Sequence, residues 1–291
     1  MVYVLQQCLN ALQLGSIYAL IALGYTMVYG VLTMINFAHG DFFMVGAFLC
    51  FISATFLRLS FVPSLLLTMG CLTFLGVFVE RVAYRPLRKA PRMSLIITAL
   101  GVGMFLENLT LALSPYPQHI PQLIPDINWN FFGLTVSFLQ AVILVVSVAL
   151  MLVLNFIVRR TKVGMAMRAI SWSKDVVAML GVPVNFVIAM TFALGSALGG
   201  AAGFMYGLCY PVIDPYMGVM IGWKAFISAV VGGIGDIRGA MLGGFILGAL
   251  EILVVAFFPS TYRDFVAFSL LIVLLLFKPY GIFGKPRTEK V

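Results

Sequence analysis

The feature that most constrains this chain is a series of long apolar runs separated by short polar segments. A bilayer core about 30 Å thick needs about 20 consecutive apolar residues in a helix, with a range of about 17–25. Eight runs meet that requirement: 4–31, 36–57, 61–84, 93–113, 134–158, 185–209, 239–257 and 262–278. The sequence therefore predicts an all-α polytopic membrane protein with about eight transmembrane helices.

The composition excludes a soluble protein. Of the 291 residues, 62% are hydrophobic and only 10% are charged, whereas soluble domains carry about 25% charged residues. Apolar runs occur along the whole chain, so we expect a single transmembrane domain over 1–291, with loops at 114–133 and 159–184. The net charge of +8 would suggest nucleic-acid binding in a soluble protein, but the placement of the basic residues argues against it.

The basic residues gather in three clusters, each of which follows an apolar run. They are Arg81, Arg85, Arg88, Lys89 and Arg92; Arg159, Arg160, Lys162, Arg168 and Lys174; and Lys278, Lys285, Arg287 and Lys290. Cytoplasmic loops of membrane proteins carry an excess of Lys and Arg. We therefore expect 85–92, 159–184 and 279–291 on the cytoplasmic side, and 114–133 and 210–218 on the opposite side.

One apolar stretch, 219–233, is too short for a comfortable crossing. Two interpretations remain open for it: a thin crossing, or a broken or re-entrant half-helix that returns to the same side.

Motifs for catalysis or nucleotide binding are absent. The sequence has no phosphate-binding G-x-x-x-x-G-K-[ST] loop, no H-E-x-x-H and no G-x-S-x-G. With only two histidines in the chain, we do not expect a protein-bound catalytic zinc. We therefore expect a protein that is not an enzyme and that binds no cofactor or metal itself.

The stretch "INFAHGDFFMVGAF" places three polar residues, Asn36, His39 and Asp41, between two apolar runs. Polar groups exposed to hydrocarbon are costly and usually face a wet cavity or one another. One interpretation is a helix break that lines the inner mouth of a transport path. The alternative is a capped turn, with Asn36 as the N-cap and Asp41 complementing the helix dipole.

Three further charged residues, Glu107, Lys224 and Glu251, lie in or beside apolar runs. Intramembrane charges of this kind are candidates for a transport path. Ion pairing between helices is the alternative, and the sequence favours it.

The segment 159–200 begins on the cytoplasmic side and holds a short amphipathic piece around 166–180 that ends at Gly181, before the next apolar run. A glycine and the following proline are typical helix stops. Such a helix either lies on the membrane surface or docks into a cytoplasmic partner.

Five motifs span almost the whole chain: "LGSIYALIALGYTMVYGVLTMINFAHGDF" at 14–42, "ERVAYRPLR" at 80–88, "MLGV" at 179–182, "GLCYPVIDPYMGVMIGWKAFISAVVGGIGDIRGAMLGG" at 207–244 and "KPYGIFGKPRTEKV" at 278–291. With these motifs the chain resembles the LivH-type branched-chain amino-acid permease family of ABC importers.

The resemblance implies a permease subunit in the bacterial cytoplasmic (inner) membrane. The family pairs such a subunit with a second, related permease and with two cytosolic ATPases, which bind ATP and Mg²⁺. A periplasmic binding protein delivers leucine, isoleucine or valine. The resemblance does not distinguish a homodimer from a heterodimer of permeases.

The resemblance also makes the loop 159–184 a coupling loop that contacts the ATPases. The implied contact residues are Arg168, Ala169, Trp172, Lys174, Asp175 and Gly181. Coupling loops of the family usually carry a polar and an acidic residue where this chain has Trp172 and Ser173, which puts the identity of the docking ATPase in doubt. On the opposite side, Tyr210, Asp214 and Tyr216 form the expected docking surface for the binding protein.

Two other functions compete with this interpretation. One is a related importer for urea, short amides or another amino acid. The other is a proton-coupled secondary transporter in which His39, Asp41, Glu107 and Glu251 form a relay, but such a carrier does not need a docking loop.

Overall fold

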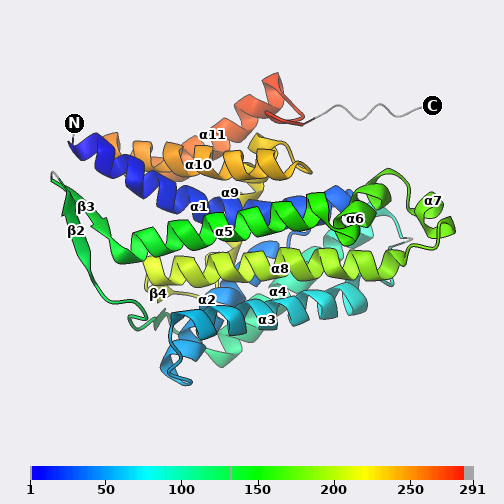
Figure 1. Cartoon of the computed structure of the whole chain (residues 1–291), viewed down its shortest axis with the longest axis horizontal. Coiled ribbons are helices and arrows are strands. Elements are labelled where there is room, and N and C mark those ends of the chain that lie inside the picture. Colours follow the sequence, from blue (N-terminus) through cyan, green and yellow to red (C-terminus); the bar gives the residue numbers. More distant parts are fainter. Residues whose placement is uncertain (1, 89, 132, 285–291) are drawn as a thin grey trace.

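The computed structural model describes residues 2–88, 90–131 and 133–284, and its helices run roughly along one common axis (Figure 1). The helices are α1 (Val2–Leu32), α2 (His39–Thr55), α3 (Phe61–Val79), α4 (Arg92–Leu113), α5 (Phe138–Arg160), α6 (Lys162–Trp172), α7 (Lys174–Met179), α8 (Val184–Cys209), α9 (Met217–Gly232), α10 (Ile237–Phe257) and α11 (Tyr262–Phe277). A π-helical turn, η1 (Glu80–Tyr84), continues α3.

Helices dominate the chain, and the all-α prediction is confirmed. Six of the described helices are long and apolar enough to cross a membrane, whereas α2 and α9 are shorter. The expected number of eight crossings is therefore approximate.

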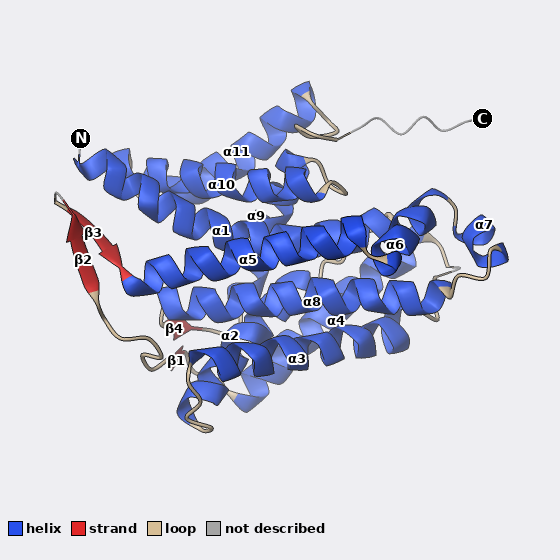
Figure 2. Cartoon of the chain, in the orientation of Figure 1, coloured by secondary structure: helices blue, strands red, loops and turns tan. Residues whose placement is uncertain are grey.

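Two small antiparallel sheets interrupt the helical pattern at one end of the molecule (Figure 2). Strand β1 (Gln118–His119) pairs with β4 (Val212–Ile213), and β2 (Asn128–Phe131) pairs with β3 (Leu134–Ser137).

The expected helix over 134–158 therefore begins later, at Phe138. The cause is a long-range contact, because the Gln6 side chain donates to the Thr135 carbonyl at 3.0 Å and accepts from the Thr135 amide at 3.1 Å. These two bonds fasten strand β3 to the beginning of α1.

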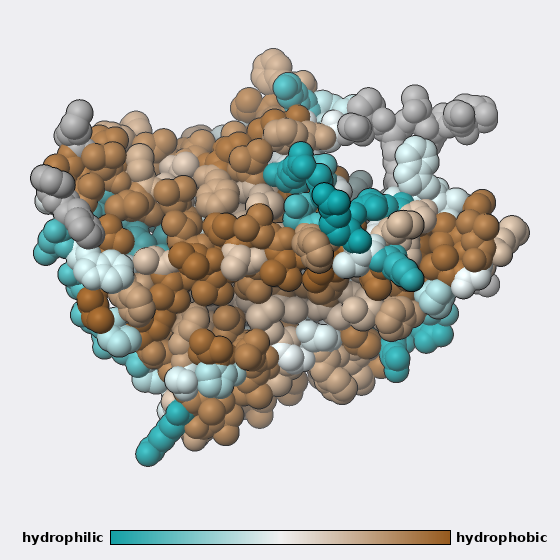
Figure 3. Space-filling view, in the orientation of Figure 1, coloured by the Kyte–Doolittle hydropathy of each residue, from teal (hydrophilic) through white to brown (hydrophobic). Residues whose placement is uncertain are grey.

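The loops sort to two ends of the bundle, as the charge pattern predicts. Helices α6 and α7 lie at one end, called the basic end here, and both small sheets lie at the opposite end (Figure 1). Arg88 contacts Asn185 at the basic end, and 279–284 border a cavity there with Ser171. Lys89, Lys285, Arg287 and Lys290 lie outside the described residues. Hydrophobic residues cover the middle of the face drawn in Figure 3, and hydrophilic ones gather toward its ends.

Helices α1 and α8 form the buried centre, and glycines let α2 approach it closely. A Cβ at Gly203 of α8 would lie 1.9 Å from the Phe43 carbonyl oxygen, and one at Gly24 of α1 would lie 2.0 Å from His39 Nε2. The glycines repeated along α8 therefore serve packing within this chain.

Helices α2 and α9 both begin inside the bundle, where their first turns meet. A Cβ at Gly40 would lie 2.3 Å from the Gly218 carbonyl oxygen. From there α9 runs to the basic end, where Gly233 contacts Gly281 and Gly284. Because β4 belongs to the opposite end, the chain crosses the bundle between residues 213 and 233. Helix α9 is shorter than the six long apolar helices and covers only part of that crossing, without returning to the end that holds β4.

Candidate functional site

The polar stretch after α1 is a true break in the helical structure. Residues 33–38 are not helical, and α2 begins at His39 with Ala38 as its N-cap. The prediction of Asn36 as the N-cap is therefore wrong. Asn36 instead closes a turn, because its Oδ1 accepts hydrogen bonds from the Ala38 amide at 3.2 Å and the Tyr84 hydroxyl at 2.6 Å.

His39 is packed into the core. Its ring lies edge-on to Tyr25, with 4.9 Å between the ring centroids. Gly24 of α1 and Gly199 of α8 leave the room that the ring occupies, since a Cβ at Gly199 would lie 3.0 Å from the imidazole. His39 is not among the residues that line the nearby cavity.

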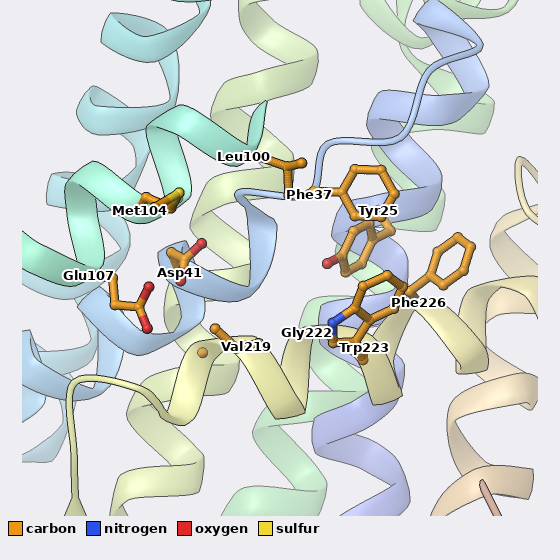
Figure 4. A pocket seen from close by; sticks show the side chains of 12 residues that line it. Tyr25, Phe37, Asp41, Leu100, Met104, Glu107, Val219, Gly222, Trp223 and Phe226 are labelled. Atoms are coloured by element: carbon orange, nitrogen blue, oxygen red, sulfur yellow. The ribbon is translucent and has the colours of Figure 1, made fainter. Parts of the chain in front are cut away.

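The neighbouring Asp41 does face that cavity, which has a volume of about 100 Å³. The side chain is 7% exposed and lies in the first turn of α2. Glu107 of α4 reaches the same space from the other side, and the two carboxylates turn toward each other (Figure 4). The complete lining consists of Tyr25, Phe37, Asp41, Leu100, Gly103, Met104, Glu107, Gly218, Val219, Gly222, Trp223 and Phe226.

Two glycines make room for the Asp41 carboxylate. A Cβ at Gly103 of α4 would lie 2.3 Å from Asp41 Oδ2, and one at Gly218 of α9 would lie 3.0 Å from Oδ1. The carboxylate thus sits at the amino-terminal turns of both α2 and α9, where partial positive charge favours an anion.

Aromatic rings form the other wall of the cavity. The ring centroids of Phe37 and Trp223 are 5.7 Å apart, and those of Tyr25 and Phe226 are 6.3 Å apart. Tyr25, Trp223 and Phe226 could not be recognised from the sequence, because aromatic residues in an apolar run are equally typical of lipid contact.

Lys224 and Glu251 lie on the other side of α9, in a separate ion cluster. Lys224 Nζ is 3.1 Å from Glu251 Oε1 and 2.7 Å from Asp264 Oδ1. Arg263 Nε is 3.4 Å from Glu251 Oε2, which also accepts a hydrogen bond from the Tyr18 hydroxyl at 3.0 Å. These contacts join α1, α9, α10 and α11, so the ion-pairing alternative describes the arrangement of Lys224 and Glu251.

The loop at the basic end contains two helices, α6 and α7, rather than one amphipathic helix. Thr161 caps α6 by accepting from the Gly164 amide at 3.1 Å, and Ser173 caps α7 by accepting from the Val176 amide at 3.4 Å. Ser173 has an extended backbone, which ends α6. Arg168 donates to the Val158 carbonyl at 2.5 Å, so this guanidinium also stabilises the end of α5.

An apolar surface is exposed on α7 and at the end of α6. Trp172 is 92% exposed, Met179 86% and Leu180 76%. Gly181 follows with φ +79°, a left-handed conformation that favours glycine and ends the helix. Lys174 and Asp175 are exposed beside this surface, while Ala169 is half-buried. Although Lys174 is exposed at the surface, neighbouring atoms remove part of its hydration, and this desolvation, followed by the positive charge of Arg88, lowers the pKa of Lys174.

A chain of polar contacts joins this loop to the helix break. Arg88 donates to Asn185 Oδ1 at 2.6 Å, at the start of α8, and pairs with Glu80 of η1. Four residues after Glu80, Tyr84 donates to Asn36 beside the start of α2. The segment 80–88 thus contacts both the helix that leaves the loop and the turn that positions Asp41.

Tyr210, Asp214 and Tyr216 lie in the segment that joins the end of α8 to the start of α9. Tyr216 is exposed, whereas Asp214 Oδ1 accepts from the Tyr216 amide at 2.8 Å and so shapes the turn before α9. The Tyr210 ring packs on Tyr206, with centroids 4.6 Å apart.

One solved structure is similar to this chain in its fold alone. A chain of PsaBC from Streptococcus pneumoniae, solved in complex with Fab, matches this chain with a TM-score of 0.50 and 13% sequence identity, and the match covers 94% of this chain and 92% of that one.

Comparisons of sequence identify the family. The family model described as branched-chain amino acid transport system / permease component matches residues 7–275. The high-affinity branched-chain amino acid transport system permease protein BraD of Pseudomonas aeruginosa is 43% identical over 99% of this chain and 98% of its own length. The corresponding permease protein LivH of Escherichia coli K12 is 41% identical over the same shares. The chain belongs to the family of branched-chain amino acid transport permeases.

Proposed function

We propose that this chain is the permease subunit of an ATP-driven ABC importer that moves leucine, isoleucine and valine into the cytoplasm. The observation that carries the proposal is the full-length similarity to high-affinity branched-chain amino acid permeases, at 43% identity over 99% of the chain. In this proposal the chain lies in the inner membrane of a bacterial cell, with its basic end on the cytoplasmic side, in accordance with the positive-inside rule.

The proposed path passes the helix break. Discontinuous helices that meet inside the membrane are typical of substrate sites in transporters, and the first turns of α2 and α9 meet in this way. We propose that the polar substrate passes α2 and α9 through the carboxylate-lined cavity beside their first turns.

The energy comes from partners, because ATP and Mg²⁺ bind to two cytosolic ATPases. The ATPases dock on the loop 159–184, with Trp172 as the main contact and Lys174, Asp175 and Gly181 around it. An exposed tryptophan in an apolar surface that is flanked by charged residues has the composition of an interface anchor. A second permease completes the channel, and a periplasmic binding protein delivers the amino acid to the end that carries Tyr210 and Tyr216.

The function is tested with the whole importer. The chain is purified from its native membrane with its partners, reconstituted in proteoliposomes and supplied with the binding protein and radiolabelled leucine. We expect uptake that requires ATP and is competed by isoleucine and valine. Uptake of urea or short amides instead would support the related importer, and activity of this chain alone without ATP would support the proton-coupled carrier.

The docking surface is tested separately with Trp172→Ala. Truncation of an anchor residue typically costs about 2 kcal/mol or more of binding energy, so we expect the ATPases to be largely lost on purification. Trp129→Ala, at the opposite end of the molecule, is the matched control. Full recovery of the ATPases with the Trp172 variant would contradict the proposed docking surface.

A further inference from the structure

The cavity at the helix break contains two carboxylates but no cation among the described residues. Asp41 and Glu107 both face it (Figure 4). The ion pairs in the described part of the chain use Arg88, Lys224 and Arg263, and none of them involves either carboxylate. Asp41 is also 93% buried, since only 7% of it is exposed. An unpaired, buried carboxylate aimed into a cavity calls for a positively charged group there.

The helix ends compensate only part of this charge. Each helix amino terminus is equivalent to about half a positive charge. The first turns of α2 and α9 both approach Asp41, because Gly40 and Gly218 are in contact. Together they balance roughly one negative charge, which leaves the charge of Glu107 uncompensated.

The size of the cavity suits a small cationic group. The space open to the centre of a water molecule is about 100 Å³, and about 10–15 Å³ of such space is enough to hold one water molecule. An ammonium group and the carbon that bears it therefore fit. An apolar substituent on that carbon reaches the aromatic wall, where the ring centroids of Phe37 and Trp223 lie 5.7 Å apart.

We infer that the cavity between Asp41 and Glu107 binds the ammonium group of the transported amino acid, with its aliphatic side chain against Phe37 and Trp223. The inference rests on the proposed function, because it assigns the recognition element within that path. The ammonium group would supply the missing positive charge and donate charge-assisted hydrogen bonds to the carboxylates. The substrate's α-carboxylate plays no part in this contact.

A ligand series tests the inference on the unmodified protein. The complex of permeases and ATPases, in nanodiscs and without the binding protein, is examined by saturation-transfer NMR with three ligands. We expect signals from leucine and leucine methyl ester, which share the ammonium group. We expect none from 4-methylpentanoate, which keeps the aliphatic chain and carboxylate. Equal binding of all three, or binding of 4-methylpentanoate but not the methyl ester, would overturn the inference.

Two variants locate the contact. Glu107→Gln and Asp41→Asn keep the size of each side chain and remove its charge, and we expect leucine to bind at least about tenfold more weakly, as for loss of a charged hydrogen bond. Asp126→Asn, in the exposed loop before β2, is the matched control and should bind leucine normally. Unchanged binding by both cavity variants would overturn the inference.

The salt composition separates substrate from inorganic cations. Replacing sodium with choline should leave the leucine signal of the native complex unchanged, whereas a requirement for sodium would mean that the cavity holds a metal cation. Different results refute the proposed function and the ammonium site. If the native complex shows no ATP-driven leucine uptake, the proposed function is refuted. If the native complex takes up leucine normally and both cavity variants bind leucine as tightly as the native complex, only the ammonium site is refuted.

Discussion

Helix α9 separates two groups of intramembrane charges that differ in one respect. On one side, Lys224 contacts both Glu251 and Asp264, and Arg263 contacts Glu251, so two cations meet two anions. On the other side, Asp41 and Glu107 share a cavity with no cation among the described residues. The first group is balanced within the chain and the second is not.

The difference indicates what each group is for. A buried charge is tolerated when a partner and hydrogen bonds compensate it, and the balanced cluster achieves this while joining four helices. It therefore holds the helices together. The unbalanced pair has no such role, and its charge remains available to a ligand.

The largest expected effect comes from unbalancing the cluster. Lys224→Met removes the cation nearest to Glu251, which is fully buried, and breaking a buried ion pair from one side costs about 3–5 kcal/mol. We expect a marked fall in the thermal unfolding temperature of the purified complex. The double variant Lys224→Met/Glu251→Met restores neutrality and should recover most of it. A stable Lys224→Met protein that does not transport would place the cluster on the substrate path instead.

Crowding the Asp41 carboxylate should impair transport, with a smaller loss of stability than Lys224→Met causes. In Gly103→Ala the new methyl group would lie 2.3 Å from Asp41 Oδ2, so the carboxylate must turn away from its site. We expect leucine uptake to fall about tenfold, equivalent to the loss of one charged hydrogen bond.

The matched control for this change is Gly101→Ala on the same helix, where a Cβ meets open space. It should transport normally in the same uptake assay. Equal effects of the two substitutions would mean that α4 is sensitive to any added methyl group and that the Asp41 geometry is not decisive.

A smaller effect is expected from releasing the turn that positions Asp41. Tyr84→Phe removes the hydroxyl that donates to Asn36 at 2.6 Å, and a hydrogen bond contributes about 0.5–1.5 kcal/mol net. We expect more ATP to be hydrolysed per leucine imported, because the contact between segment 80–88 and the helix break is weakened. Tyr116→Phe, on the exposed opposite end, serves as the control. An unchanged ratio of ATP to leucine would remove segment 80–88 from the coupling route.

The smallest effect is expected at the edge of the balanced cluster. Arg263 is 29% exposed and Glu251 keeps Lys224 when the guanidinium is lost. Partly exposed ion pairs contribute about 0–1 kcal/mol, so Arg263→Gln should lower the unfolding temperature far less than Lys224→Met. A larger loss for Arg263→Gln would reverse the order of importance within the cluster.

The helices were predictable because a crossing helix leaves a long apolar run in the sequence. The late start of α5 was not, since strand β3 depends on Gln6, more than a hundred residues away. The sequence also pointed to Asp41, Glu107, Lys224 and Glu251 as charges in apolar surroundings. It could not separate them into two groups, because only the packing of α9 puts Lys224 on one side and Asp41 on the other.

The most direct test of the account compares two neutralised variants in one assay. Leucine uptake per folded importer is measured in proteoliposomes for Asp41→Asn/Glu107→Gln and for Lys224→Met/Glu251→Met, alongside their unfolding temperatures. We expect the first variant to fold normally and lose uptake, and the second to be somewhat less stable but to transport at nearly the native rate per folded complex. Normal uptake by the first variant, together with abolished uptake by a well-folded second variant, would contradict the account.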